Sequence, residues 1–192
     1  VIDKVNAFLI DIEIFCHFYF FAGKISFFRQ FEIFAIAANE LKNRLTDMLG
    51  PEGQNVWAMT FHSCCCRILR SHIERLGFTG SFTIYDTSDS ERIMKEIIRD
   101  MGLDDKTFPA KYVLSVIGRE KDKLVSAQEY MDRVEATNDI RLYHIAKAYV
   151  KYQTKLKENN ALDFDDLIAN TVKILREYPE AREYWQRRFR YI

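Results

Sequence analysis

The chain has 192 residues, of which 28 are Lys or Arg, 28 are Asp or Glu and 48% are hydrophobic. This length and apolar content support one large or two small domains with a substantial core, and they argue against disorder. The balanced charge neither indicates nor excludes a nucleic-acid partner, because charge can segregate to one face.

Residues 1–36 differ in composition from the rest of the chain. Nine of the fifteen Phe lie within residues 1–34, without clean periodicity. The longest apolar run, Ile14 to Gly23, is too short to span a bilayer. No basic front end with a small-residue cleavage site precedes it. We therefore expect no transmembrane helix.

From Ala37 onward, apolar residues recur at helical spacing. The first predicted helix ends at Gly50-Pro51, and Val56–Met59 ("VWAM") is predicted to form a short buried strand. Ser63 is the predicted N-cap of the next helix, which Gly77 ends.

A short extended segment near Phe82 is predicted next. Two capping-box patterns follow, Ser88 with Glu91 and Ser126 with Glu129. Pro109 is predicted to open the next helix, and a long helix is predicted from about Asp139 to Asn159. Asp163 is predicted to cap a further helix, and a last helix is predicted to start near Pro179. That last helix is predicted to bury Tyr184, Trp185 and Phe189, and residues 190–192 to begin a strand.

The cysteines do not form a recognisable site. Cys64, Cys65 and Cys66 are contiguous, and Cys16 is far away. Adjacent cysteines suit neither a disulfide framework nor the spaced pairs of a zinc site, and on a helix they point in three directions. We expect reduced thiols in a cytoplasmic protein.

The segment Thr60-Phe61-His62-Ser63 offers a hydroxyl, an aromatic face, an imidazole and the N–H groups of a helix start together. Such groups suit a phosphate backbone with a stacked base. Catalysis by His62 requires a partner that spacing does not reveal.

Two charged stretches have competing interpretations. The acids of "ALDFDDLI" could bind a metal or act as acid and base, but their position favours a cap and a helix-dipole role. The basic residues Lys111, Arg119, Lys121 and Lys123 could meet phosphates, although a solvated face is commoner. No P-loop is found, because Gly23-Lys24 lacks the upstream glycine and the following Ser or Thr.

Three blocks in order, "VWAMTFHSCCCRILRSHIERLGFTGSFTIYDTSD", "KENNALDFDDLI" and "RRFRYI", resemble the amino-terminal half of UvrD/PcrA/Rep-type DNA helicases of superfamily 1. The resemblance implies an α/β, predominantly helical fold, in which a partial RecA-like P-loop motor domain is interrupted by an all-α insert subdomain. The implied boundaries are a motor layer over 37–82, the insert over 83–160, and a return to the motor layer over 161–192.

The resemblance also implies a function. Members of the family translocate 3′-to-5′ on single-stranded DNA and unwind duplex DNA with ATP and Mg²⁺. Residues Thr60, Phe61, His62 and Ser63 match the family's "TFHS" segment, which lines the single-strand path, and Lys121 falls in the insert region that approaches duplex DNA. The family's "LDFDDL" block, to which we assign an architectural role, is matched by Asp163, Phe164, Asp165, Asp166 and Leu167.

The sequence departs from the family in its nucleotide motifs. The P-loop is absent, the "TFTNKAA" segment survives only as Ala37-Ala38, and the acidic "DEYQD" metal-binding segment is expected after Ile192. We therefore expect no ATPase activity in this chain, and we hypothesise that residues 1–36 are not native helicase sequence. The alternatives are a non-catalytic DNA-binding module and an unrelated helical interaction protein.

Overall fold

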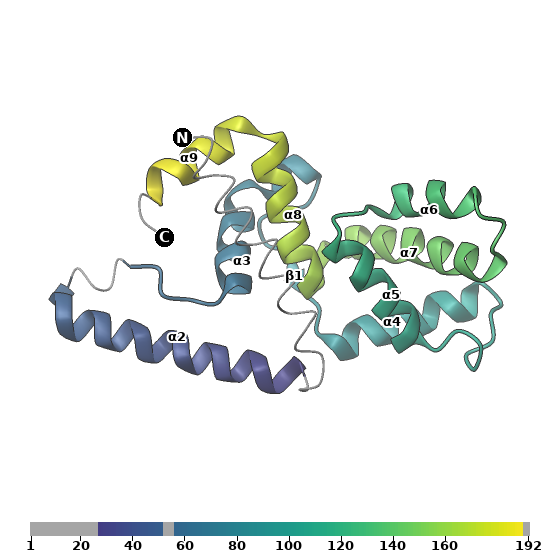
Figure 1. Ribbon diagram of the computed structural model, residues 1–192, viewed down its shortest axis with the longest axis horizontal. Helices are drawn as coiled ribbons and strands as arrows, with labels where there is room; N and C mark the ends of the chain where they lie inside the picture. Colours follow the sequence, from purple (N-terminus) through teal and green to yellow (C-terminus); the bar gives the residue numbers. More distant parts are fainter. Residues whose placement is uncertain (1–26, 52–55, 190–192) are drawn as a thin grey trace. The chain divides into compact units, whose positions relative to one another are not determined.

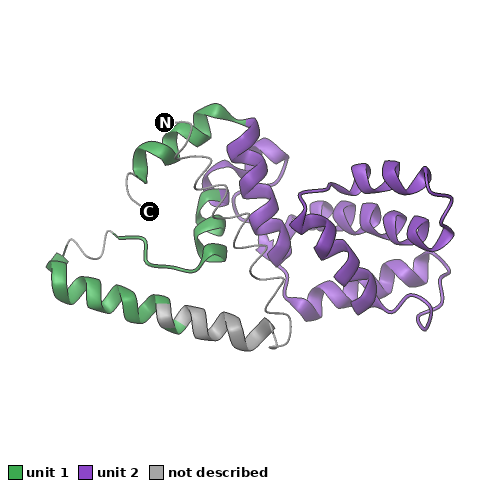
Figure 2. Cartoon of the chain, in the orientation of Figure 1, with its two compact units in different colours: residues 1–68, 178–192 green, residues 69–177 purple. Residues whose placement is uncertain are grey.

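The computed structural model describes residues 27–51 and 56–189, which fold mostly as helices with one small parallel sheet. The chain divides into two compact units, Val1–Ile68 with Tyr178–Ile192 and Leu69–Glu177 (Figure 2). We call them unit 1 and unit 2 and describe each by itself. The borders predicted from the sequence at 82/83 and 160/161 fall inside unit 2, and that domain scheme stays a prediction.

Unit 1 contains helix α2 (Phe27–Leu49), the start of helix α3 (Phe61–His72) and helix α9 (Pro179–Arg188). The predicted end of α2 is confirmed, since Gly50 follows it with a φ of 63°. The predicted burial in α9 is only partly right, because Trp185 is buried whereas Tyr184 is 54% exposed. The strand proposed for residues 190–192 lies outside the described residues.

The predicted strand Val56–Met59 is wrong, because this segment forms neither a strand nor a helix. The Ala58 N–H donates to the Val56 carbonyl over 3.0 Å, so the backbone turns locally instead of pairing with another strand. The following helix begins at Phe61, two residues before the predicted cap at Ser63. A short apolar run does not by itself distinguish a strand from a turn that buries side chains.

Unit 2 holds the end of α3 and the 3₁₀ helix η2 (Ile73–Leu76), followed by four helices that share one apolar core. These are α4 (Thr87–Asp100), α5 (Ala110–Asp122), α6 (Ala127–Glu135) and α7 (Ile140–Glu158), seen in teal to green in Figure 1. Their inward residues recur at helical spacing, as in Ile93, Met94, Ile97 and Ile98 of α4.

Two short strands open and close this run of helices. Strand β1 (Thr83–Ile84) precedes α4, and strand β2 (Ala161–Leu162) follows α7 and leads into helix α8 (Phe164–Glu177). They pair in parallel, with Thr83 opposite Ala161 and Ile84 opposite Leu162. The chain therefore leaves for the four helices and returns from them at the same place (Figure 1).

The cap predictions met with mixed results. The capping box of Ser126 and Glu129 and the cap at Asp163 are confirmed, as is the long helix from about Asp139 to Asn159, which is α7. The predicted box of Ser88 and Glu91 is wrong, because α4 begins earlier and Asp86 pairs with Asp89 instead. Both pairs have the same spacing, and an acidic side chain accepts the capping hydrogen bond as well as a serine does.

Within the described residues, no helix combines the length and apolarity that a membrane crossing needs.

Candidate functional site

The segment Thr60–Ser63 forms the start of α3 in unit 1. The Thr60 hydroxyl accepts a hydrogen bond from the Ser63 N–H (3.2 Å) and lies 2.9 Å from the Ser63 hydroxyl. The Thr60 carbonyl accepts from the Cys64 N–H over 2.9 Å. Thr60 is therefore the N-capping residue, and its side chain fixes the backbone of the whole segment at the helix start.

The two rings in this segment differ in exposure. Phe61 presents 37% of its surface to solvent. His62 is half-buried, and burial lowers the pKa of its imidazole below the ordinary value of 6.5. His62 is accordingly neutral at pH 7, so that its imidazole acts as a hydrogen-bonding group and not as a cation.

Helix α3 also carries the three cysteines. Cys65 is buried among apolar neighbours, as the helical pattern predicts, while Cys64 and Cys66 are half-buried. Burial raises the pKa of the Cys64 thiol to about 11, which opposes formation of a reactive thiolate. Among the residues described, no group of three or more His, Cys, Asp or Glu side chains is arranged to hold a metal ion.

The "LDFDDL" block builds a buried charge cluster in unit 2, which we call the Lys121 cluster: Lys121, Asp163 and Asp166. The Lys121 ammonium lies 2.6 Å from Asp163 Oδ2 and 2.9 Å from Asp166 Oδ1. Its side chain is only 2% exposed. The predicted contact of Lys121 with DNA stays a prediction, since the ammonium is enclosed by these two carboxylates in the structure.

The same two aspartates fix the first turn of α8. Asp163 Oδ1 accepts from the Asp166 N–H over 2.9 Å, which makes Asp163 the cap of the helix. The Gln153 side-chain amide of α7 donates to Asp166 Oδ1 over 3.2 Å. Leu167 is buried, and Phe164 is half-buried as the first residue of the helix. These contacts support the architectural role assigned to Asp163–Leu167.

Lys121 and Asp163 hold each other ionised, whereas burial, followed by the charge of Asp163, raises the pKa of Asp166 from 3.8 to about 6. Burial alone opposes the charge of Lys121, but Asp163 and Asp166 outweigh it and raise the pKa of Lys121 well above its ordinary value. Burial likewise opposes the charge of Asp163, and Lys121 outweighs it and lowers the pKa of that carboxyl. Sequence spacing gave no sign of this pairing, because 42 residues separate Lys121 from Asp163.

The charge of Lys121 compensates Asp165 only in part. Burial, followed by the charge of Asp163, raises its pKa from 3.8 to about 7. Its carboxylate approaches the backbone of α5 closely, since a Cβ added to Gly118 would lie 3.0 Å from Asp165 Oδ2. Gly118 is thus a residue that sequence reasoning missed, and its small size permits the contact between α5 and the start of α8.

A cleft of about 620 Å³ in unit 2 reaches the Lys121 cluster. Its walls include Tyr149 and Gln153 of α7 and Asn170 and Lys173 of α8. The Tyr149 hydroxyl donates to the Val125 carbonyl over 3.1 Å, which closes one side of the cleft. Three polar side chains that line the cleft, Lys121, Gln153 and Asp166, are therefore occupied by contacts with one another.

We predict that Lys121→Met destabilises the chain strongly. Removal of one partner leaves two buried carboxylates facing each other, at a cost of about 3–5 kcal/mol in the free energy of unfolding. Urea unfolding followed by circular dichroism measures the change. The matched control is Lys123→Met, which removes an exposed ammonium from the buried Glu120 carboxylate (2.9 Å) while Arg133 still pairs with it, and should cost less than about 1 kcal/mol. Equal effects of the two substitutions would contradict the assigned role.

We predict that stability falls as the pH rises from 5 to 8, in part through Asp165. With a folded-state pKa of about 7 against 3.8 as the ordinary value, the folded state retains a proton that the unfolded state has lost. Asp165→Asn removes this penalty and should raise the free energy of unfolding at pH 8 by about 1–2 kcal/mol, with a clearly smaller gain at pH 5. Urea midpoints at the two pH values test it. A parallel pH dependence of variant and wild type would exclude this explanation.

Comparison with known proteins identifies the family. A model of the UvrD/REP helicase N-terminal domain matches residues 35–192. The ATP-dependent DNA helicase PcrA of Bacillus subtilis is 39% identical over 156 residues, which cover 81% of this chain and 21% of the relative. The ATP-dependent DNA helicase UvrD1 of Mycobacterium tuberculosis is 36% identical over 157 residues, covering 81% of this chain and 20% of that protein.

The chain thus spans about a fifth of the length of the curated relatives that it matches. The match covers the start of α3, the helices of unit 2 and the "LDFDDL" block. The family resemblance found in the sequence is therefore confirmed, and the chain belongs to the UvrD/REP helicase N-terminal domain family.

Proposed function

We propose that this chain is a portion of an ATP-dependent DNA helicase whose intact form moves 3′-to-5′ along single-stranded DNA and unwinds duplex DNA. Within it, Thr60, Phe61, His62 and Ser63 contact the single strand. The observation that carries this assignment is the geometry at the start of α3, where a capped backbone presents a partly exposed aromatic ring.

The chemistry of that helix start suits a nucleic-acid strand. A base stacks on an exposed aromatic ring without regard to sequence, which suits a protein that moves along DNA. The Ser63 hydroxyl, which is exposed, and the neutral imidazole of His62 add hydrogen-bonding groups beside the ring. The ion pairs that organise unit 2 favour an architectural role for the "LDFDDL" block, separate from DNA contact.

ATP and Mg²⁺ serve the intact helicase in this proposal, but the residues of this chain do not fit them. The 192 residues contain no G-x-x-x-x-G-K-[ST] segment to cradle phosphates. The acidic residues best placed to attract a cation, Asp163 and Asp166, are already neutralised by Lys121. We assign no nucleotide-dependent step to this chain, and we place the protein in the cytoplasm.

We predict that the purified chain binds oligo(dT) weakly at low salt and that Phe61→Ala reduces the affinity. Loss of one stacked base costs about 1–3 kcal/mol, or roughly 5- to 150-fold. Fluorescence anisotropy of labelled oligo(dT) measures it. The control is Tyr143→Ala on α7, which removes a ring of matched exposure, 38% against 37%, from unit 2. Affinity unchanged by Phe61→Ala, or reduced equally by both, would oppose the proposed contact.

We predict that the same preparation shows no ATP turnover, with or without oligo(dT). Phosphoryl transfer requires a phosphate-cradling lysine, a metal site and a positioned water. A coupled assay for released phosphate in the presence of Mg²⁺ tests this expectation, with a full-length helicase of the family as positive control. Turnover that copurifies with the chain through successive columns would refute it.

A further inference from the structure

The side chain of Trp57 lies in an aromatic cluster of unit 1, three residues before Thr60. Its ring centroid lies 5.4 Å from that of Trp185 and 5.1 Å from that of Phe189. Trp185 and Phe189 stack on each other with centroids 5.5 Å apart. The segment that leads into α3 is thereby packed against the end of α9, although more than 120 residues separate the two in sequence.

Two arginines share the ring of Trp57. The Arg67 guanidinium lies 4.1 Å from the ring centroid, and the Arg188 guanidinium lies 5.4 Å from it. Both arginines are exposed. Neither forms an ion pair with a carboxylate among the described residues, so two positive charges converge on one ring without a counter-charge.

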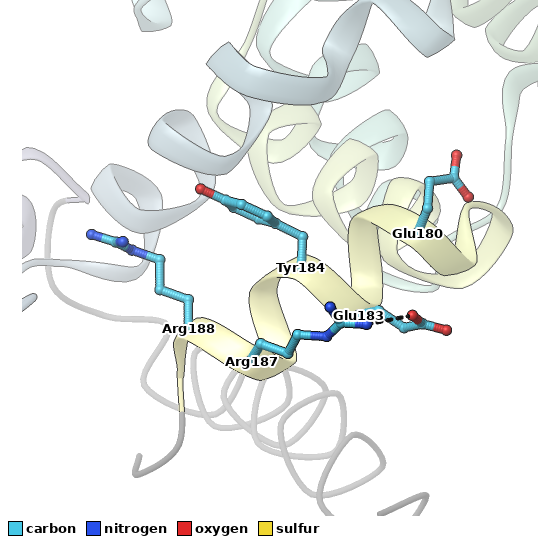
Figure 3. A pocket seen from close by; sticks show the side chains of 5 residues that line it. All are labelled: Glu180, Glu183, Tyr184, Arg187 and Arg188. Atoms are coloured by element: carbon cyan, nitrogen blue, oxygen red, sulfur yellow. Dashed lines mark hydrogen bonds and ion pairs between the residues drawn. The ribbon is translucent and has the colours of Figure 1, made fainter.

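The neighbouring arginines Arg187 and Arg70 have polar partners that Arg67 and Arg188 lack among the described residues. Arg187, next to Arg188, pairs with Glu183 over 3.3 Å. Figure 3 shows Arg187 turned toward Glu183, while Arg188 extends from α9 on the side of Tyr184. Arg70, one turn after Arg67, stacks on Phe82 at 3.9 Å, but its guanidinium also donates to the Gly80 carbonyl over 2.6 Å.

The geometry of a guanidinium that lies over an aromatic ring indicates which kind of ligand its remaining N–H donors can bind. Stacking on an aromatic face uses the plane of the guanidinium and leaves its N–H donors at the edge, in the geometry that binds a phosphate through two hydrogen bonds. Two guanidiniums on one ring repel each other unless an anion lies between their edges. An open pocket of about 550 Å³ along the same helix is lined by Glu180, Glu183, Tyr184, Arg187 and Arg188, so Arg188 borders a surface that also carries two carboxylates (Figure 3).

Arg67 lies one helical turn after Ser63 on α3, so the two side chains share a face of the helix. A strand that contacts the Ser63 hydroxyl is therefore within one helical turn of Arg67.

We propose that Arg67 and Arg188, held on the ring of Trp57, bind a backbone phosphate of the single strand that Thr60–Ser63 contacts. This inference rests on the proposed function, because it names a second contact with the same strand. Trp57 is a positioning residue in this scheme, since it orients both guanidiniums and anchors the segment before Thr60.

The test is the salt dependence of oligo(dT) binding by the wild type, Arg67→Gln, Arg188→Gln and Arg187→Gln. Loss of one phosphate contact on a single strand reduces the slope of log affinity against log salt by about 0.7. We expect this reduction, with about fivefold weaker binding, for Arg67→Gln and Arg188→Gln. Arg187→Gln removes the same charge from α9 but should leave the slope unchanged, because Arg187 is paired with Glu183. Equal slopes for all four proteins would overturn the proposal.

A second measurement separates this inference from the proposed function. Both Trp residues of the chain, Trp57 and Trp185, lie in the cluster, so intrinsic fluorescence reports on it directly. We expect sodium tripolyphosphate to change the emission of the wild type and of Arg187→Gln, but not of the double variant R67Q/R188Q. Such a response without oligo(dT) binding would reject the DNA contact and retain the anion site. Absence of any response in the wild type would reject the site itself.

The thermal unfolding of each variant is measured by circular dichroism as a control for folding. A variant that unfolds at the wild-type temperature but shows a reduced salt slope supports a role of the substituted residue in binding. Trp57→Phe should restore most of the affinity that Trp57→Ala loses, because a phenyl ring still supports a stacked guanidinium. Equal loss in both Trp57 variants, with wild-type unfolding, would contradict the positioning role.

Discussion

The burial of the Lys121 ammonium between Asp163 and Asp166 is the constraint on which unit 2 depends. An ammonium that is 2% exposed is tolerated only when carboxylates neutralise it and satisfy its donors. The same carboxylates cap the first turn of α8, so one set of contacts joins the end of α5 to the start of α8. Gly118 completes the junction, because a larger residue would collide with Asp165.

This junction supports an architectural role for the acidic block, although its composition is that of a catalytic or metal site. Two of its acids are committed to the ammonium and to helix N–H groups, and Asp165 lies against the α5 backbone. A catalytic carboxylate must be accessible to a substrate, and a carboxylate that binds a metal ion must have free lone pairs. Asp163 and Asp166 instead use their lone pairs to bind the Lys121 ammonium. The excess of acids over bases leaves Asp165 with a raised pKa, which is the cost of packing three aspartates around one lysine.

Basic residues that lie close together in the sequence do not form a joint binding surface here, whereas two arginines that are far apart in the sequence meet in the fold. The basic stretch of α5 suggested a phosphate-binding face, but Lys111 lies near Glu91, Lys123 binds Glu120 and Lys121 is buried. Arg67 and Arg188, by contrast, are far apart in sequence and meet at Trp57 without a carboxylate among the described residues. These two arginines, without an ion pair among the described residues, lie in unit 1 with the segment Thr60–Ser63.

The sequence by itself determined the family, through ordered blocks such as "TFHS" and "LDFDDL", and it determined most helices, because apolar spacing and caps such as Ser126 and Asp163 are local signals. It misplaced the start of α3, where a short apolar run was ambiguous, and the cap of α4, where Asp86–Asp89 and Ser88–Glu91 have the same spacing. Only the tertiary structure decided that Lys121 is buried, that Gly118 must be small and that Trp57 gathers two arginines. Those facts depend on contacts between residues that are dozens of positions apart in the sequence. Such contacts are set by side-chain packing, which produces no local or periodic pattern in the sequence.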